Sequence, residues 1–361
     1  MRIPLQLLSF VLLLSLSVSC NSTVKERATD TDTDTTATLL GAGRQPQIAV
    51  DTKGIARVVY GLQDKIYCVT SKDNGETFSE PVLVGQLKGL YLGMSMGPQI
   101  ASSKNYSVVT AIDKQGDIHT YSLNHTTDKW VKAAAVNDVP GVAPEGLMSI
   151  ASDEQDTFYA VWLDVRNNKQ NKIVFASTTG GAEKWSGNKV VYESPDSTVC
   201  ECCKPSIAVE GRQVYLMFRN WIDGSRDFYL TKSTDNGQQF SQPQKLGTGT
   251  WKLKGCPMDG GGILLDSKNV MHTAWQREGS IFYVQPGQQE VQIGKGRNCR
   301  ISGKTNPVIA WKNGTDLKLK FLNADTETVV GKGSYIETAE MPDNKTLCVW
   351  EDERKIHFRK I

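Results

Sequence analysis

Four cysteines lie in two short segments whose residue types could support metal binding or disulfide chemistry. Cys200, Cys202 and Cys203 form a Cys-x-Cys-Cys element, and Cys256 begins a Cys-Pro-Met-Asp-Gly element. Thiolates are good ligands for Cu(I) and Zn(II), so these four sulfurs are candidate ligands of copper or zinc. Cysteines of exported proteins usually pair, so a disulfide between Cys256 and one member of the cluster is the alternative. Both hypotheses require the two segments to meet in space.

A second set of residues could recognise an anionic group. A guanidinium group offers paired donors at permanent charge, which suits a carboxylate. Several arginines lie before or after expected strands, and two acids and a tryptophan accompany them: Arg44, Arg166, Arg219, Arg226, Arg277, Asp227, Asp259 and Trp251. We expect these side chains to form a ligand-binding face if the fold brings their loops together.

The N-terminal segment predicts export and lipid anchoring. Arg2 precedes an apolar stretch that ends at Cys20, which is the pattern of a signal peptide over residues 1–20. Residues 16–20 resemble a bacterial lipobox, whose cysteine is lipidated; a plain secretory signal is the alternative. Residues 21–37 are polar and predict a disordered tether. We therefore expect a lipid-anchored protein of the bacterial cell envelope, periplasmic or surface-facing, that contacts the bilayer through this anchor.

Composition narrows the class of protein further. The formal net charge of +2 is nearly neutral, so no overall excess of basic residues argues for nucleic acid, and we expect no nucleic-acid partner. The chain has eight cysteines, and lipidation of Cys20 would leave an odd number in an oxidising compartment. At least one cysteine is then expected to be free, buried or bound to something.

The remaining chain is a series of short β-branched and aromatic runs separated by polar turns, which predicts an all-β fold. Similar first strands recur at residues 47–50, 99–101, 149–151, 206–209 and 262–265, and two weaker units lie around residues 308–311 and 335–358. Four strands in each unit are typical of a propeller blade, because such a small sheet covers its faces only against its neighbours. We predict a β-propeller over residues 38–361 with four-stranded blades, seven blades being favoured over six. The run at residues 37–40 is expected to complete the last blade and close the ring.

Two turns carry a more specific repeat. Residues 71–78 and 233–240 both match Ser-x-Asp-x-Gly-x-x-Phe, and residues 122–130 and 177–185 look like degraded copies. This pattern resembles the Asp-box, or BNR, repeat of the sialidase superfamily. The resemblance implies that each box joins the third and fourth strands of a blade, away from the active site. Asp73 and Asp235 are then turn residues. The arginines and cysteines fall in loops on the opposite face.

The sialidase resemblance also implies a catalytic site on that face. Members of the superfamily grip the substrate carboxylate with three arginines and use a tyrosine nucleophile with a nearby acid. Arg44, in an Arg-x-Pro element, and Arg219 match the carboxylate ligands, Tyr335 the nucleophile and Asp64 the acid. The pattern is incomplete, since no Glu clearly matches the base paired with the tyrosine. The two cysteine elements resemble a subgroup of secreted BNR-repeat proteins.

Two functions remain open from the sequence. One is a sialidase-like propeller that recognises an anionic glycan on its arginine-rich face and could hydrolyse it as a sialidase-type glycoside hydrolase. The other is a non-catalytic binding module for copper, zinc or a partner protein through Cys200, Cys202, Cys203 and Cys256.

Overall fold

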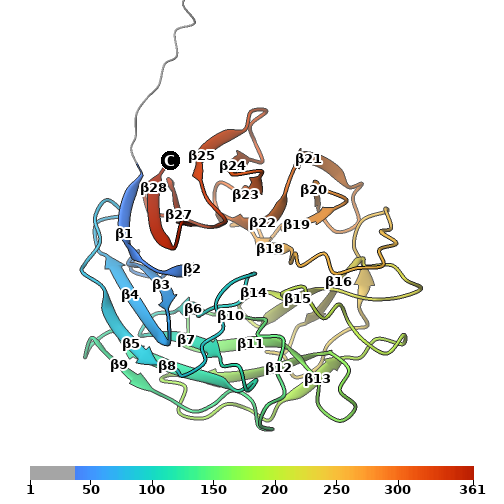
Figure 1. Cartoon of the computed structure of the whole chain (residues 1–361), viewed down its shortest axis with the longest axis horizontal. Helices are drawn as coiled ribbons and strands as arrows, with labels where there is room; N and C mark the ends of the chain where they lie inside the picture. The colour runs from blue at the N-terminus through green and yellow to red at the C-terminus, as the bar shows by residue number, and fades with distance from the viewer. Residues whose placement is uncertain (1–36) are drawn as a thin grey trace, which may run out of the picture. The chain divides into compact units, whose positions relative to one another are not determined.

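Seven four-stranded antiparallel sheets make up residues 37–361, the part of the chain that the computed structural model describes. The first strand of each sheet contacts the first strands of two neighbouring sheets, which arranges the sheets around one axis (Figure 1). This confirms the predicted seven-bladed β-propeller. The predicted signal peptide, its lipidation site Cys20 and residues 21–36 of the predicted tether lie outside the described residues. The described residues contain no helix that could cross a bilayer.

The first four blades follow one another along the chain. Blade 1 comprises β2 (Arg44–Val50), β3 (Ala56–Leu62), β4 (Lys65–Ser71) and β5 (Val82–Gln86). Blade 2 comprises β6 (Gln99–Ser102), β7 (Tyr106–Ile112), β8 (Ile118–Asn124) and β9 (Lys129–Lys132). Blade 3 comprises β10 (Met148–Ser152), β11 (Thr157–Asp164), β12 (Lys172–Thr179) and β13 (Lys189–Tyr192). Blade 4 comprises β14 (Ser206–Glu210), β15 (Gln213–Arg219), β16 (Phe228–Ser233) and β17 (Gln244–Lys245).

The last three blades complete the ring. Blade 5 comprises β18 (Gly262–Leu265), β19 (Met271–Arg277), β20 (Ser280–Val284) and β21 (Val291–Lys295). Blade 6 comprises β22 (Arg297–Ser302), β23 (Val308–Asn313), β24 (Asp316–Phe321) and β25 (Thr328–Lys332). Blade 7 comprises β26 (Tyr335–Glu340), β27 (Thr346–Asp352), β28 (Lys355–Lys360) and β1 (Thr38–Ala42).

Blade 7 is built from both ends of the described chain. β1 pairs antiparallel with β28, and Thr38 lies opposite Phe358 in the ladder. This confirms the expected closure by the start of the propeller. Because the first and last strands share one sheet, blade 7 cannot separate from blade 1 without breaking a β-ladder.

Aromatic side chains of one blade pack against glycines in the fourth strand of the blade before it. Trp311 in β23 lies against Gly294 in β21, and Trp350 in β27 lies against Gly331 in β25. At both glycines a Cβ atom would come within 3 Å of the indole, so only glycine permits this approach. Each tryptophan is almost fully buried. The apolar clusters that contain these tryptophans therefore lie between neighbouring blades.

The two Ser-x-Asp-x-Gly turns join third and fourth strands, as predicted. Asp73 accepts a hydrogen bond from the hydroxyl of Ser71 (2.8 Å) and another from the N–H of Thr77 (3.0 Å). The hydroxyl of Ser71 accepts the N–H of Gly75 at 2.8 Å, and the turn at Asp235 repeats this pattern. Phe78 packs on Phe358 of the preceding blade, with ring centroids 4.9 Å apart. Each turn therefore ties its own blade to the one before it.

The glycines of these turns are expected to differ in their tolerance of alanine. Gly75 and Gly237 both have φ of +80°, so alanine at either position costs about 1–2 kcal/mol of backbone strain. A Cβ atom on Gly237 would also overlap ring atoms of Phe175, whereas one on Gly75 would lie 3.3 Å from Leu347. We expect Gly237→Ala to lower the free energy of unfolding more than Gly75→Ala does, by a further ~1–3 kcal/mol. Denaturant unfolding measures both variants, and equal losses would contradict this account.

Candidate functional site

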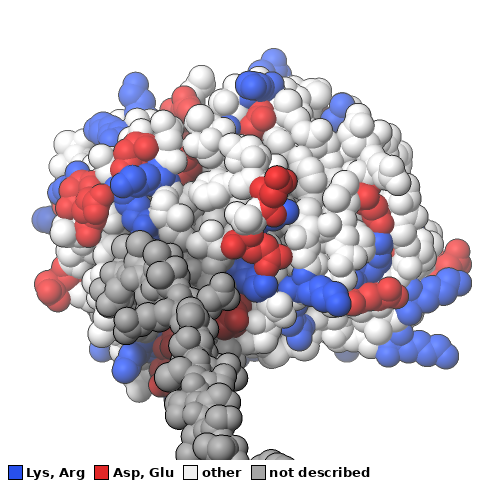
Figure 2. Space-filling model, turned by 90° about the horizontal axis from the view of Figure 1, so that it is seen from above, with Lys and Arg blue, Asp and Glu red and all other residues white. Residues whose placement is uncertain are grey.

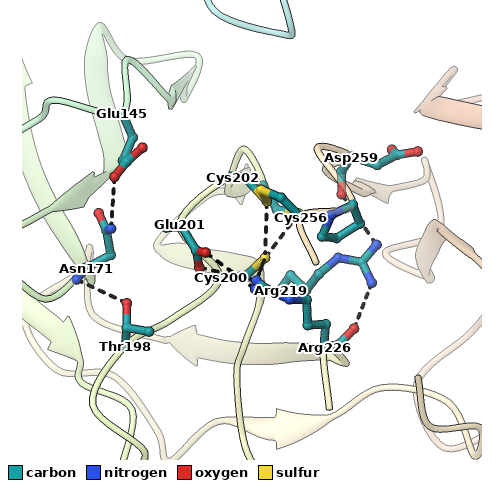
Figure 3. The surroundings of a disulfide bond; sticks show 12 residues. Glu145, Asn171, Thr198, Cys200, Glu201, Cys202, Arg219, Arg226, Cys256 and Asp259 are labelled. Carbon is teal, nitrogen blue, oxygen red and sulfur yellow. Dashed lines mark hydrogen bonds and ion pairs between the residues drawn. A yellow bond between two sulfur atoms is a disulfide. The ribbon is translucent and has the colours of Figure 1, made fainter. Parts of the chain in front are cut away.

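The loops that carry most of the predicted site residues meet on one face of the propeller. The loop that leads into β14 contacts the loop after β15, because the N–H of Cys200 donates to the carbonyl of Arg219 at 3.0 Å. The loop that leads into β18 joins them through a disulfide between Cys202 and Cys256 (Figure 3). The two cysteine elements therefore meet in space, as both cysteine hypotheses required.

A buried pair of thiols lies beside this disulfide. The sulfur of Cys200 is 3.4 Å from that of Cys203 and 3.7 Å from that of Cys202. Arg226 donates from Nη1 to the sulfur of Cys200 at 2.9 Å and also contacts Glu201. Burial opposes ionisation of Cys200, but its hydrogen bond with Cys203 and the nearby guanidinium charges outweigh this effect and lower the pKa of the Cys200 thiol. Burial raises the pKa of Cys203. The negative charge of the pair is thus favoured on Cys200.

The disulfide limits what this cluster can bind. The sulfurs of Cys200, Cys202 and Cys203 lie within 4.8 Å of one another, as metal ligands do. Cys202 and Cys256 are oxidised, however, so only two thiols remain as donors, fewer than a zinc site uses. In this oxidation state the cluster does not supply the four sulfur ligands that were predicted, and copper or zinc binding stays a prediction.

The predicted arginines each have a partner within the protein. Arg44 pairs with Glu351 at 3.1 Å, Arg166 pairs with Asp164 at 2.9 Å, and Arg277 pairs with Glu290. Arg219 is only 2% exposed, and it donates to the carbonyls of Arg226 (2.7 Å) and Gln276 (2.8 Å) and packs over the ring of Phe228. In this structure these guanidinium groups brace the loops of the face.

Three predicted acids also have structural partners. Asp64 accepts the N–H of Gly89 at 2.9 Å. Asp227 accepts the N–H of Trp251 at 2.8 Å and pairs with Lys245, so it positions the loop that carries Trp251. Asp259 is buried and accepts the N–H of Asn298 at 2.8 Å. Burial raises the pKa of Asp259 to about 6.

Tyr335 belongs to a buried polar network around the central channel, which we call the channel cluster: Gln47, Gln99, Lys204, Arg300, Tyr335 and Glu337. Arg300 donates to Glu337 at 2.7 Å and to the hydroxyl of Tyr335 at 3.3 Å. Gln47 donates to both Tyr335 and Glu337. Lys204 donates to Gln99 at 3.0 Å and lines a small cavity of about 140 Å³ with Gln47 and Arg300. The cluster therefore places two cations beside one carboxylate in the interior.

Burial and neighbouring charges together set the ionisation of the channel cluster. It lowers the pKa of Lys204 to about 7, and the charge of Arg300 adds to this effect. It opposes ionisation of Glu337, but the charges of Arg300 and Lys204 outweigh it and lower the pKa of that carboxyl. It also raises the pKa of Tyr335, which is 3% exposed. The tyrosine proposed as a nucleophile is therefore held protonated and away from solvent.

Sequence reasoning missed Lys204, Arg300 and Glu337 as members of this network. The sixth blade was expected to lie around residues 308–311, whereas its first strand, β22, spans Arg297–Ser302. Cys299 lies inside β22 and is buried. The available signal was spacing: Tyr335 and Glu337 are two residues apart in one strand, so they face the same side of the sheet.

A larger cavity of about 690 Å³ opens between blades 5 and 6. Its lining comes from the loops that lead into β18 and β22 and from the turns between β19 and β20 and between β23 and β24. Trp251, Lys295, Arg297 and Lys312 contribute side chains, and none of its lining residues, all within the described part of the chain, is an Asp or Glu. By contrast, both signs of charge are interspersed on the side shown in Figure 2.

The cations of this cavity are more available than the other arginines described above. Lys295 and Arg297 are exposed, and Arg297 uses Nη2 to donate to the carbonyl of Pro257 at 2.9 Å. Cys256 of the disulfide also lines the cavity. Among these lining residues, Trp251 was predicted to bind the anionic ligand and Cys256 to bind a metal, and the others were not predicted. We call this space the basic cavity.

No protein-family model matches the sequence, and no curated protein matches it either. Solved structures match by fold. The BP39L lectin from Burkholderia pseudomallei is 11% identical with a TM-score of 0.64, over 90% of this chain and 96% of that one. A PL25 ulvan lyase bound to -[GlcA(1-4)Rha3S]- is 10% identical with a TM-score of 0.58, over 90% and 95% of the two chains. A GH93 α-L-arabinofuranosidase from Fusarium graminearum is 13% identical with a TM-score of 0.52, over 81% and 95%. At these identities the likeness shows the fold, a β-propeller, and no more.

Proposed function

We propose that this protein recognises an anionic glycan in the basic cavity. The observation that carries the proposal is the lining itself, which combines Trp251 with Lys295, Arg297 and Lys312 and includes no carboxylate. An aromatic face can stack on a sugar ring, while exposed cations attract a carboxylate or sulfate group. A glycan that carries uronic acid or sulfate ester groups fits this chemistry better than a neutral one.

The structurally similar proteins support a glycan as the ligand, and one of them is bound to an anionic saccharide. They are a lectin, an arabinofuranosidase in complex with arabinobiose, and a lyase bound to -[GlcA(1-4)Rha3S]-. The N-terminal pattern would place such binding in the cell envelope, through a lipidated Cys20.

Our proposal is binding without sialidase-type hydrolysis. Tyr335 is buried and protonated, and Arg219 uses its donors on backbone carbonyls. A carboxylate gripped by Arg219 and attacked by Tyr335 would require both side chains to leave these positions. Turnover of a fluorogenic sialoside that is lost in Tyr335→Phe would contradict this part of the proposal.

Affinity measurements with matched polysaccharides test the proposal. We expect binding to a sulfated or uronic-acid polysaccharide, no binding to a neutral one, and weaker binding at high ionic strength. Arg297→Ala should lower the affinity by about ten- to a hundredfold, because a hydrogen bond to a charged group contributes about 1.5–3 kcal/mol.

Lys254→Ala is the matched control. Lys254 is an exposed cation near Trp251 in the sequence, but it does not line the basic cavity. If the glycan binds within the basic cavity, Lys254→Ala should change the affinity less than twofold, because an exposed charge outside the site contributes little free energy. Equal losses in both variants, or equal binding of neutral and acidic polysaccharides, would contradict the proposed site.

A further inference from the structure

The disulfide links the basic cavity to the buried thiols behind it. Cys256 is exposed and lines the basic cavity, and Cys202 is half-buried. Cys200 and Cys203 are buried at 0% and 1% exposure. The four sulfurs therefore differ in depth. The two nearer to solvent, Cys202 and Cys256, form the disulfide, and the two buried ones, Cys200 and Cys203, are free thiols.

Cys200 has the position of a nucleophile toward this disulfide. Its sulfur lies 3.7 Å from Cys202 and accepts a hydrogen bond from the guanidinium of Arg226. A cationic donor on sulfur favours the thiolate, which is the form that attacks a disulfide. The other described free cysteines outside this cluster, Cys68, Cys299 and Cys348, are buried elsewhere, in strands of blades 1, 6 and 7.

We propose that Cys200 and the Cys202–Cys256 disulfide undergo internal thiol–disulfide exchange, which releases Cys256 as a thiolate into the basic cavity. The Cys200 sulfur gives its proton to solvent and bonds to the Cys202 sulfur. The Cys202–Cys256 bond breaks, and its electron pair stays on Cys256. One disulfide is consumed and one is formed, so the step needs no oxidant or reductant.

The exchange gives the basic cavity a second chemistry, which does not depend on glycan binding. The released Cys256 thiolate can attack a disulfide of a partner molecule, forming a mixed disulfide while the partner's other sulfur leaves as a thiolate. The cations around Cys256 favour a partner whose disulfide lies near acidic groups. While Cys256 is still a free thiolate, its attack on Cys202 breaks the Cys200–Cys202 bond, releases Cys200 as a thiolate and restores the starting state.

Alkylation of the folded protein tests the exchange. Treatment with iodoacetamide, followed by peptide mapping without reduction, should show Cys256 alkylated progressively and a new disulfide between Cys200 and Cys202. In Cys200→Ser, Cys256 should stay unlabelled and bonded to Cys202. Cys203→Ser is the matched control, since it removes a neighbouring buried thiol and should leave the labelling of Cys256 in place.

Labelling of Cys68 and Cys348, which are 2% and 0% exposed, reports any global unfolding during the reaction. Absence of label on Cys256 in the unaltered protein would overturn the proposal, whatever the stability of the variants. Equal labelling of Cys256 in the unaltered protein and in Cys200→Ser would overturn it too.

Discussion

Glu337→Ala is expected to lower the free energy of unfolding by about 3–5 kcal/mol, because removing one partner of a buried ion pair leaves an uncompensated charge. Glu337 accepts hydrogen bonds from Arg300 at 2.7 Å and Gln47 at 2.8 Å, and its side chain is 12% exposed. The loss leaves the buried guanidinium of Arg300 without its carboxylate partner. Denaturant unfolding of Glu337→Ala and of the unaltered protein measures this difference in the free energy of unfolding.

An exposed ion pair provides the control for this loss. Glu210 pairs with Lys304 at 3.1 Å, but the two side chains are 37% and 54% exposed. Glu210→Ala should therefore cost less than about 1 kcal/mol. A second variant, Glu337→Ala combined with Arg300→Met, should recover part of the loss by removing the stranded charge. Similar losses for Glu337→Ala and Glu210→Ala would show that the channel cluster is not an electrostatic unit.

Lys204→Met is expected to raise the free energy of unfolding at pH 7, on the order of 3 kcal/mol, because a buried ammonium group is replaced by an apolar side chain. Lys204 lies within the interior with Gln99 as its hydrogen-bond acceptor, and burial lowers its pKa from 10.5 to about 7. Loss of that hydrogen bond offsets about 1 kcal/mol of the gain.

The sign of the pH dependence follows from the lowered pKa of Lys204. Between pH 7 and pH 10.5 the unfolded chain binds a proton at Lys204 that the folded protein lacks, so this residue's contribution to stability rises with pH. Below pH 7 its penalty is fully present. The advantage of Lys204→Met over the unaltered protein should therefore shrink as pH rises from 7 to 9. Other titrating groups are common to both proteins, so their effect cancels in the difference in unfolding free energy. A difference that stays constant from pH 7 to pH 9 would contradict the lowered pKa of Lys204.

The fold could be predicted because its signals are local and repeated. Period-two runs mark strands, and the Ser-x-Asp-x-Gly turns recur at matching places in their units, so the propeller and its closing strand were foreseeable. The exception was β22, where the run from Arg297 to Ser302 mixes charged and apolar residues and does not resemble a buried strand. Arg297 of this strand lines the basic cavity and Arg300 belongs to the channel cluster, and neither site was predicted from the sequence.

The site was harder to predict because its contacts join distant parts of the chain. Arg44 is paired with Glu351, which lies 307 residues away, and Arg300 is paired with Glu337 in the next blade. The sequence identifies arginines in loops, but it does not show which of them already have an acidic partner. The basic cavity shows the opposite situation. Its cations can be identified as a site for an anion only from the fold, which shows that no Asp or Glu is among the lining residues.

A structure of the protein with an acidic oligosaccharide would test the account most directly. We expect a sugar ring to lie on Trp251 and a carboxylate or sulfate group to lie within hydrogen-bond distance of Arg297 or Lys295. The competing site is a groove of about 600 Å³ between blades 1 and 2, beside Asp73, lined by His125 and Trp130 among others. An oligosaccharide in that groove, or at Tyr335 in the channel cluster, with the basic cavity empty, would contradict the account.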